Sequence, residues 1–191
     1  MTLSDPQGRL FIISAPSGAG KSTLCRLLMA RVPDLRYSVS TTTRAPRQGE
    51  VDGKDYWFTD PETFETGIKT DRWAEWAEVH GNYYGTSATF IDQQRADGHD
   101  VLLDIDVQGA AQIQTKYPHA ITIFIMPPSM AVLRQRLEQR GTDTPATIEK
   151  RLANARIEMA QGASYRHTVV NDHLEEAVGT LIDIVQRYRN G

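Results

Sequence analysis

A glycine-rich segment near the start of the chain carries the residue types that bind nucleotide phosphates. It reads Ser14-Ala15-Pro16-Ser17-Gly18-Ala19-Gly20-Lys21-Ser22-Thr23. In such a P-loop the glycines let backbone N–H groups converge on phosphate oxygens, the lysine reaches the β- and γ-phosphates, and the next hydroxyl ligates Mg²⁺. We therefore predict that residues 14–23 bind a nucleoside triphosphate with Mg²⁺, with Lys21 catalytic and Ser22 a metal ligand.

The flanking residues supply the strand and the helix that must position this loop. The apolar run Leu10–Ser14 predicts a buried strand before it, and Leu24 and Leu28 begin an apolar helical stripe after it. The strand fixes the loop, and the helix N-terminus adds partial positive charge. The strict pattern has glycine where this chain has Ala15, which we expect to be tolerated because alanine is small, although it disfavours positive φ.

A second polar group, around Arg44 and Arg47, has the chemistry of a phosphate clamp. Hydroxyl residues precede the two arginines, and Tyr56 and Tyr84 follow them along the chain. Guanidinium groups bind phosphate oxygens bidentately, and phenol hydroxyls add neutral donors. These residues could hold a monophosphate as the acceptor opposite the P-loop.

Composition limits the kind of protein that carries these groups. The chain has 191 residues, 40% of them hydrophobic, a net charge of −3 and one cysteine, Cys25. This suits one core domain with insertions, gives no general attraction to nucleic acid, and excludes an internal disulfide or a cysteine-cluster zinc site. No apolar run approaches the ~20 residues of a membrane span, and no signal peptide is evident. We expect a cytoplasmic protein without nucleic-acid or membrane partners.

Hydrophobic periodicity predicts an α/β fold with a doubly wound parallel sheet. Short apolar segments followed by helical patterns are expected as buried strands: Leu10–Ser14, Asp100–Ile105, Ile121–Met126 and Thr168–Val170. Helix starts are expected at Asp60-Pro61, at Ser129 and at a capping box formed by Asp172 and Glu175.

Two stretches interrupt that rhythm. Residues 38–89 mix hydroxyl, aromatic and charged residues with β-like pieces at Asp55–Thr59 and Glu78–Tyr84, which predicts a small α/β insertion carrying a binding surface. Residues 135–164 are helical and arginine-rich, with a break at Gly141 and a restart at Thr144-Pro145. Two such helices suit a lid over phosphates.

Taken together, these motifs closely resemble the guanylate kinase family from about Leu10 to Tyr188. The resemblance rests on the P-loop and three further patterns: Ser40-x-x-x-Arg44-x-Pro46-Arg47, Gly81-Asn82-Tyr83-Tyr84-Gly85-Thr86 and Asp104-Ile105-Asp106-x-Gln108-Gly109. It implies transfer of the γ-phosphate of ATP to GMP, with dGMP as a further acceptor, in purine metabolism and GMP recycling. It also implies a CORE with a five-stranded parallel sheet (1–37, 90–134, 165–191), a GMP-binding domain (38–89) and a LID (135–164).

The same resemblance implies roles for the matching residues. The GMP phosphate would be held by Ser40, Arg44, Arg47, Tyr56 and Tyr84, and guanine would be recognised by Glu75, Thr86 and Asp106. The LID would bring Arg136, Arg140 and Arg151 onto the transferring phosphate, as catalytic residues beside Lys21 and Arg44. Asn171 would lie near adenine. Asp104, at the end of an apolar strand, could support the Mg²⁺ shell with Ser22.

Hydrogen bonding explains why a carboxylate and a hydroxyl would select guanine. Glu75 can accept from the guanine N1–H and amino group, while Thr86 can donate to O6. Adenine presents an acceptor at N1 and would leave buried polar groups unpaired, at about 1–3 kcal/mol each.

Three other functions remain open at this point. A non-catalytic guanylate-kinase-like binding module would typically lack Lys21 or the LID arginines. A kinase for AMP or UMP would conflict with Glu75 and Thr86, and a regulatory GTPase would need an Asn-Lys-x-Asp motif that the chain lacks. The sequence does not set the oligomeric state, so a homo-oligomer stays open.

Overall fold

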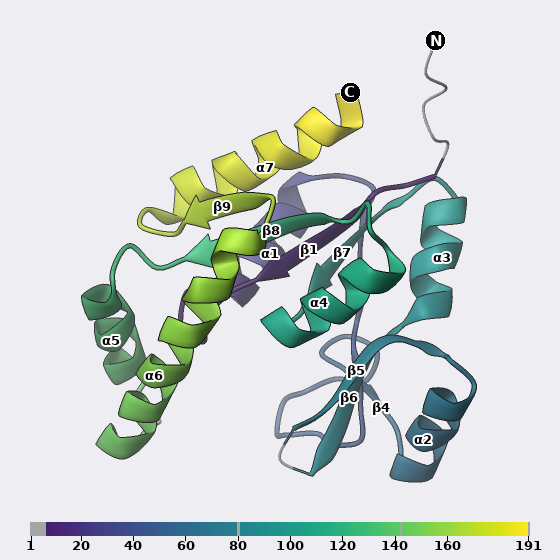
Figure 1. Cartoon of the computed structure of the whole chain (residues 1–191), viewed down its shortest axis with the longest axis horizontal. Helices are drawn as coiled ribbons and strands as arrows, with labels where there is room; N and C mark the ends of the chain where they lie inside the picture. Colours follow the sequence, from purple (N-terminus) through teal and green to yellow (C-terminus); the bar gives the residue numbers. More distant parts are fainter. Residues whose placement is uncertain (1–6, 80, 142, 191) are drawn as a thin grey trace. The chain divides into compact units, whose positions relative to one another are not determined.

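A computed structural model describes residues 7–79, 81–141 and 143–190 (Figure 1). The elements follow in chain order: β1 (Leu10–Ser14), α1 (Lys21–Arg31), β2 (Leu35–Tyr37), β3 (Thr41–Thr42), β4 (Trp57–Phe58), α2 (Pro61–Lys69), β5 (Trp73–Val79), β6 (Asn82–Ser87), α3 (Ala88–Ala96), β7 (Asp100–Asp104), α4 (Val107–Lys116), β8 (Ile121–Met126), α5 (Met130–Gln139), α6 (Pro145–Gln161), the 3₁₀ turn η1 (Gly162–Ser164), β9 (His167–Val170) and α7 (Leu174–Asn190).

The strands form two sheets. A five-stranded sheet has the order β2-β7-β1-β8-β9, and a four-stranded sheet has the order β4-β3-β6-β5. In the larger sheet β1 pairs in parallel with β8, β8 with β9, and β2 with β7. The predicted α/β fold with a five-stranded parallel sheet is therefore confirmed, and β2 is the strand that periodicity did not predict.

The chain divides into two compact units. The first unit contains the described residues of 1–10, 34–103 and 108–120; the second contains those of 11–33, 104–107 and 121–191. The predicted CORE, GMP-binding and LID boundaries are a different division, and they stay a prediction.

The second unit contains most of β1 and all of β8, which are the buried strands of the larger sheet in this unit. β1 is buried along its whole length because the apolar side chains of residues 10–13 face neighbours on both sides of the sheet. α5 and α6 lie side by side in Figure 1 and share a small core formed by Leu133, Leu137, Ile148, Leu152 and Ala155. The arginine-bearing helices are thus held by their own apolar seam.

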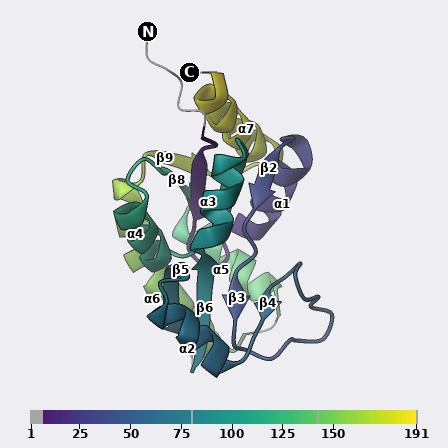
Figure 2. The ribbon, with the colours of Figure 1, turned by 90° about the vertical axis from the view of Figure 1, so that its right-hand side faces the viewer.

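The first unit contains the four-stranded sheet. β5 and β6 form an antiparallel hairpin whose pairing reaches Val79 and Asn82, and α2 lies beside β6 (Figure 2). The expected β-like piece Glu78–Tyr84 contains the end of β5 and the start of β6. The piece Asp55–Thr59 contains the short strand β4.

Helix caps follow the sequence at three of four expected places. Side chains accept the expected backbone hydrogen bonds at Asp60, Ser129 and Thr144. The capping box at Asp172 was wrong: α7 begins at Leu174, and Glu175 instead forms a bidentate ion pair with Arg31 at 2.7 and 3.0 Å.

Candidate functional site

The P-loop connects β1 to α1 within the second unit. Gly18 and Gly20 have φ values of 97° and 92°, a region that only glycine enters without strain. Ala15 is absent from the described non-glycine residues with positive φ, so alanine fits there as expected. Gly20 also caps α1 without any side-chain acceptor. The first N–H groups of α1 are therefore left for an anion, as at other phosphate-binding helix starts.

Lys21 meets the carboxyl end of β7. Its Nζ forms an ion pair with Asp104 and donates to the Ile105 carbonyl at 3.1 Å. Ser14 Oγ donates to the Asp106 carbonyl at 3.4 Å. The structure thus brings together the predicted catalytic lysine and the predicted metal-supporting carboxylate, both mostly buried.

Asn171 binds the P-loop itself. Its side-chain amide donates to the Ala19 carbonyl at 2.7 Å, and its own backbone carbonyl accepts from Arg136 Nη2 at 2.8 Å. A Cβ added to Gly20 would collide with the Asn171 amide. Asn171 therefore supports both the P-loop and the side chain of Arg136.

The three arginines predicted to act from a LID differ in their surroundings. Arg136 Nη1 is buried and has no hydrogen-bond partner among the described residues. Arg151 pairs with Asp143 at 3.2 Å, and Arg140 is exposed at the end of α5. Arg136 is the arginine with an unused buried donor.

A carboxylate from α6 also lies at the P-loop, and sequence reasoning missed it. Burial raises the pKa of Glu158, and the charge of Asp106 adds to this, while Lys21 and the Ser17 N–H favour the charged form. The position of Glu158 on a helix with an apolar stripe gave no signal of this role.

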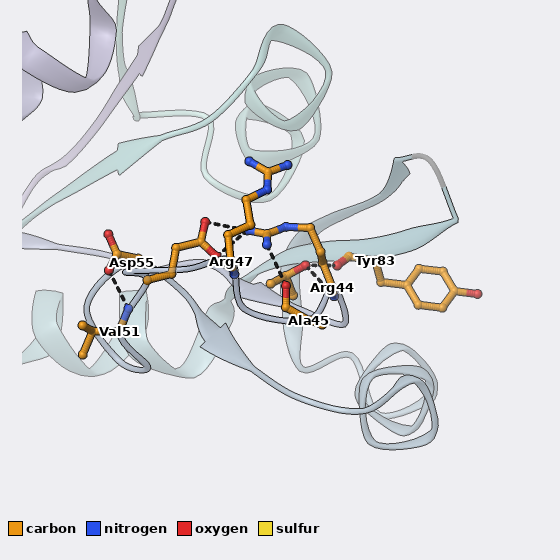
Figure 3. A network of polar contacts seen from close by, with 8 residues as sticks. Arg44, Ala45, Arg47, Val51, Asp55 and Tyr83 are labelled. Carbon is orange, nitrogen blue, oxygen red and sulfur yellow. Dashed lines mark hydrogen bonds and ion pairs between the residues drawn. The ribbon is translucent and has the colours of Figure 1, made fainter. Parts of the chain in front are cut away.

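In the first unit, Arg44 is held by an ion pair within its own loop (Figure 3). Its Nη2 donates to both oxygens of Glu50 at 2.8 and 3.0 Å, and its Nη1 donates to the Ala45 carbonyl at 2.7 Å. Glu50 also accepts the Arg47 backbone N–H at 2.8 Å. The hydrogen bonds from the Arg44 side chain and from the Arg47 N–H lower the pKa of Glu50. Sequence reasoning gave Glu50 no role, although it lies six residues after Arg44.

Aromatic rings surround this arginine. The Arg44 guanidinium lies 5.4 Å from the centre of the Tyr56 ring, and Tyr56 and Tyr84 pack edge to face at 5.9 Å. Three of the predicted phosphate-holding residues are thus brought together. Ser40 uses its carbonyl to accept the Trp57 N–H, and Arg47 is exposed.

Glu75 and Thr86 meet on the β5–β6 hairpin. They are register partners, and Thr86 Oγ1 donates to Glu75 Oε1 at 2.6 Å. Glu75 is 8% exposed and Thr86 1% exposed, so this polar pair is buried. Asp106, the third predicted guanine residue, is exposed and belongs to the second unit.

A parallel α/β sheet with a P-loop between β1 and α1, and a lysine paired with the acidic end of β7, defines a P-loop phosphotransferase. The comparisons with known proteins identify the family of phosphotransferases to which the chain belongs. The guanylate kinase family model matches residues 7–188. The chain is 50% identical to a guanylate kinase of Neisseria gonorrhoeae over 183 residues, covering 96% of this chain and 89% of the relative. It is 46% identical to one of Symbiobacterium thermophilum over 180 residues, covering 94% and 85%.

Solved structures agree. The crystal structure of guanylate kinase from Anaplasma phagocytophilum superposes with a TM-score of 0.77 at 34% identity, covering 95% of this chain and 86% of that one. A shikimate kinase from Bacteroides thetaiotaomicron shares the fold alone, with a TM-score of 0.51 at 13% identity, covering 93% of this chain and 98% of that one. The chain belongs to the guanylate kinase family of nucleoside monophosphate kinases. Within the described residues, no helix combines the length and apolar character needed to span a membrane.

Proposed function

We propose how this chain performs the guanylate kinase reaction, in which ATP and GMP give ADP and GDP. The reaction follows from membership of the family. The residue roles are our proposal. The observation that carries the proposal is the buried Glu75–Thr86 pair, a carboxylate and a hydroxyl 2.6 Å apart on one hairpin.

The donor nucleotide is bound by the P-loop, residues 14–23. Backbone N–H groups of the loop and the start of α1 surround the phosphates, and Lys21 shifts from Asp104 toward the β- and γ-phosphate oxygens. Phosphoryl transfer requires positioning and charge neutralisation more than covalent chemistry from the protein. Asn171 contributes to ATP binding by holding the loop carbonyl at Ala19.

The donor atoms beside Lys21 fit Mg²⁺. In kinase sites Mg²⁺ usually takes one or two carboxylates, with phosphates and water supplying the other ligands. Asp104 and the Ser22 hydroxyl offer such a set, and the described residues hold no cluster of three metal-binding side chains that would form an all-protein cage. When bound with ATP, Mg²⁺ supplies neutralisation of the phosphate charge.

The acceptor phosphate is held by side chains of the first unit. Arg44 bonds Glu50 and the Ala45 carbonyl and also interacts with Tyr84, and a phosphate oxygen would bind to this guanidinium beside or in place of these partners. Tyr56 and Tyr84 lie against it, and Ser40 and Arg47 complete the proposed set. The acceptor phosphate is already an anion, so the reaction needs no general base.

Guanine is recognised by Glu75 and Thr86, with Asp106 as a third contact. The Thr86 hydroxyl has a single proton, and in this structure it donates a hydrogen bond to Glu75 through that proton. With GMP bound, guanine N–H groups take over as donors to Glu75, and the Thr86 hydroxyl rotates toward O6. None of these contacts involves the sugar 2′-hydroxyl, so dGMP is proposed as a second acceptor.

The LID arginines neutralise charge on the transferring group. Arg136 has the strongest support because its Nη1 is buried without a partner among the described residues. An unpaired buried donor costs free energy, which binding a phosphate oxygen would recover. Arg140 and Arg151 are proposed to act beside it. The LID itself is proposed to span 135–164, and a cytoplasmic role in purine metabolism and GMP recycling completes the proposal.

A coupled assay of ADP release tests this function. ATP and Mg²⁺ are supplied with GMP, dGMP, AMP, UMP or CMP in parallel, and Lys21→Ala is the control. Rapid turnover only with the guanine nucleotides, lost in Lys21→Ala, is the expected result. Absence of turnover from protein that still binds GMP would contradict it and favour a non-catalytic binding module.

A further inference from the structure

The strand that carries Glu75 lies at the edge of its sheet. β5 comes last in the order β4-β3-β6-β5, so β6 is its single strand partner within the described sheet. The other edge of such a strand presents backbone N–H and C=O groups without a strand to pair them. The position of the Glu75 carboxylate therefore depends on β5, which the sheet holds along one edge through β6.

A β-bulge just before Glu75 decides which face its side chain uses. Trp73 pairs with Ser87 and Glu75 pairs with Thr86, so two steps on β5 match one step on β6. Thr86 and Ser87 are consecutive on β6, so their side chains point to opposite faces of the sheet. Each β5 residue shares the face of its β6 partner, so Trp73 and Glu75 also point to opposite faces. Trp73 then stacks on Phe64 at 4.4 Å, while Glu75 meets Thr86. A straight register would send both side chains to one face.

Helix α4 covers the outer edge of β5 on both sides of this bulge. The side-chain amide of Gln112 donates to the Trp76 carbonyl at 3.1 Å and accepts the Trp76 N–H at 3.2 Å. Lys116 donates to the Trp73 carbonyl at 2.9 Å and to Asp71 at 2.7 Å. Gln112 thus fills both hydrogen-bonding roles of a neighbouring strand, and Lys116 fills one.

We infer that Gln112 and Lys116 are positioning residues for guanine selection. They are four residues apart and therefore lie on one face of α4. From that face they fasten β5 on either side of the bulge and keep Glu75 on the face it shares with Thr86. This inference rests on the proposed role of Glu75 and gives α4 a part in substrate choice.

Steady-state kinetics of the full-length enzyme test this inference. Gln112→Met removes both backbone hydrogen bonds at similar side-chain size, so KM for GMP should rise about tenfold. The kcat and the KM for ATP should stay within about twofold, and the GMP-to-AMP ratio of kcat/KM should fall. Gln112→Glu keeps the acceptor for the Trp76 N–H and should give an intermediate KM. Lys116→Met should change the same parameters in the same direction.

Gln93→Met is the matched control, because that amide bonds Asp97, the residue that caps the C-terminus of its own helix, at 3.0 and 3.1 Å. A wild-type KM for GMP and a wild-type GMP-to-AMP ratio in Gln112→Met would overturn the inference. So would equal rises in the KM for ATP and for GMP with a lower Tm, which would mean a merely structural role.

Glu75→Gln, measured in the same assay, separates the two proposals. If it leaves the GMP-to-AMP ratio unchanged, the proposed role of Glu75 fails. If it lowers the ratio while Gln112→Met and Lys116→Met leave it unchanged, only the positioning inference fails.

Discussion

The P-loop and the β5–β6 hairpin, which we propose as the ATP and guanine sites, are built in different ways. The P-loop offers mainly backbone groups to a ligand: Gly18 and Gly20 adopt positive φ, and α1 begins without a side-chain cap. The hairpin and the loop that carries Arg44 offer side chains, and these side chains are paired with one another. Arg44 is bonded to Glu50, and Glu75 to Thr86.

This difference matches the chemistry of the two ligands. All nucleoside triphosphates present the same phosphates, which oriented backbone N–H groups can bind whatever the base. Guanine differs from adenine only in its donors and acceptors, so side chains with fixed positions must read them. Changes at the P-loop should therefore alter donor use, and changes at the hairpin should alter acceptor choice.

The largest effect is expected from Lys21→Ala. Loss of the cation that meets the β- and γ-phosphates should lower kcat about 10³-fold, while GMP affinity stays within about twofold. Stopped-flow turnover and calorimetric GMP titration measure the two quantities. Lys150→Ala, an exposed lysine on α6, is the matched control. A parallel loss of GMP affinity in Lys21→Ala would break the separation of the two regions.

Asn171→Ala tests whether the donor site depends on support of its backbone. It removes the bond to the Ala19 carbonyl but leaves the backbone carbonyl that Arg136 uses. We expect KM for ATP to rise about tenfold with KM for GMP unchanged. The preference for ATP over GTP as donor should not change. A selective loss of ATP preference would instead assign Asn171 to adenine recognition.

Glu50→Gln tests the proposed GMP-phosphate site by weakening the ion pair between Glu50 and Arg44. Glu50 holds Arg44 in place, and both side chains are mostly buried, at 19% and 14% exposure. Loss of that orientation should raise KM for GMP about fivefold without changing KM for ATP. A lower KM for GMP would show that Glu50 competes with the substrate phosphate for Arg44.

The smallest effect concerns stability rather than either site. Burial lowers the pKa of His167, with help from Arg187 and Arg166, and its ring contacts Tyr188 Oη at 2.9 Å. As pH falls below about 6.5, the unfolded chain takes up this proton before the folded protein does, so stability decreases. The Tm of wild type should fall between pH 7.5 and 5.5 by up to about 2 °C more than that of His167→Gln. An equal fall in both proteins would exclude this histidine as the cause, and exposed His173→Gln is the control.

Local sequence patterns made the P-loop and its flanking strand and helix predictable. Glycines, lysine and flanking apolar residues lie within about 20 consecutive positions, so strand, loop and helix could be placed together. The buried strands and the caps at Asp60 and Ser129 followed from periodicity and cap chemistry for the same reason. The short strand β2 has only one buried residue, Leu35, and gave too weak a pattern.

The acceptor side depends on contacts between distant residues, which periodicity does not encode. Glu75 and Gln112 lie on elements separated by β6, α3 and β7, and the bulge before Glu75 has no marker such as glycine. The spacing of Asp172 and Glu175 predicted a capping box. The actual partner of Glu175 is Arg31, 144 residues away, and no local pattern in the sequence indicates this pairing. Resemblance to a family supplied residue roles there, but it gave no support residues.

Crossed binding titrations of Lys21→Ala and Glu75→Gln test the division between the two regions most directly. Each variant is titrated with GMP and with a non-hydrolysable ATP analogue in the presence of Mg²⁺. We expect Lys21→Ala to lose affinity for the ATP analogue alone, and Glu75→Gln to lose affinity for GMP alone. Loss of both affinities in either variant would contradict the account.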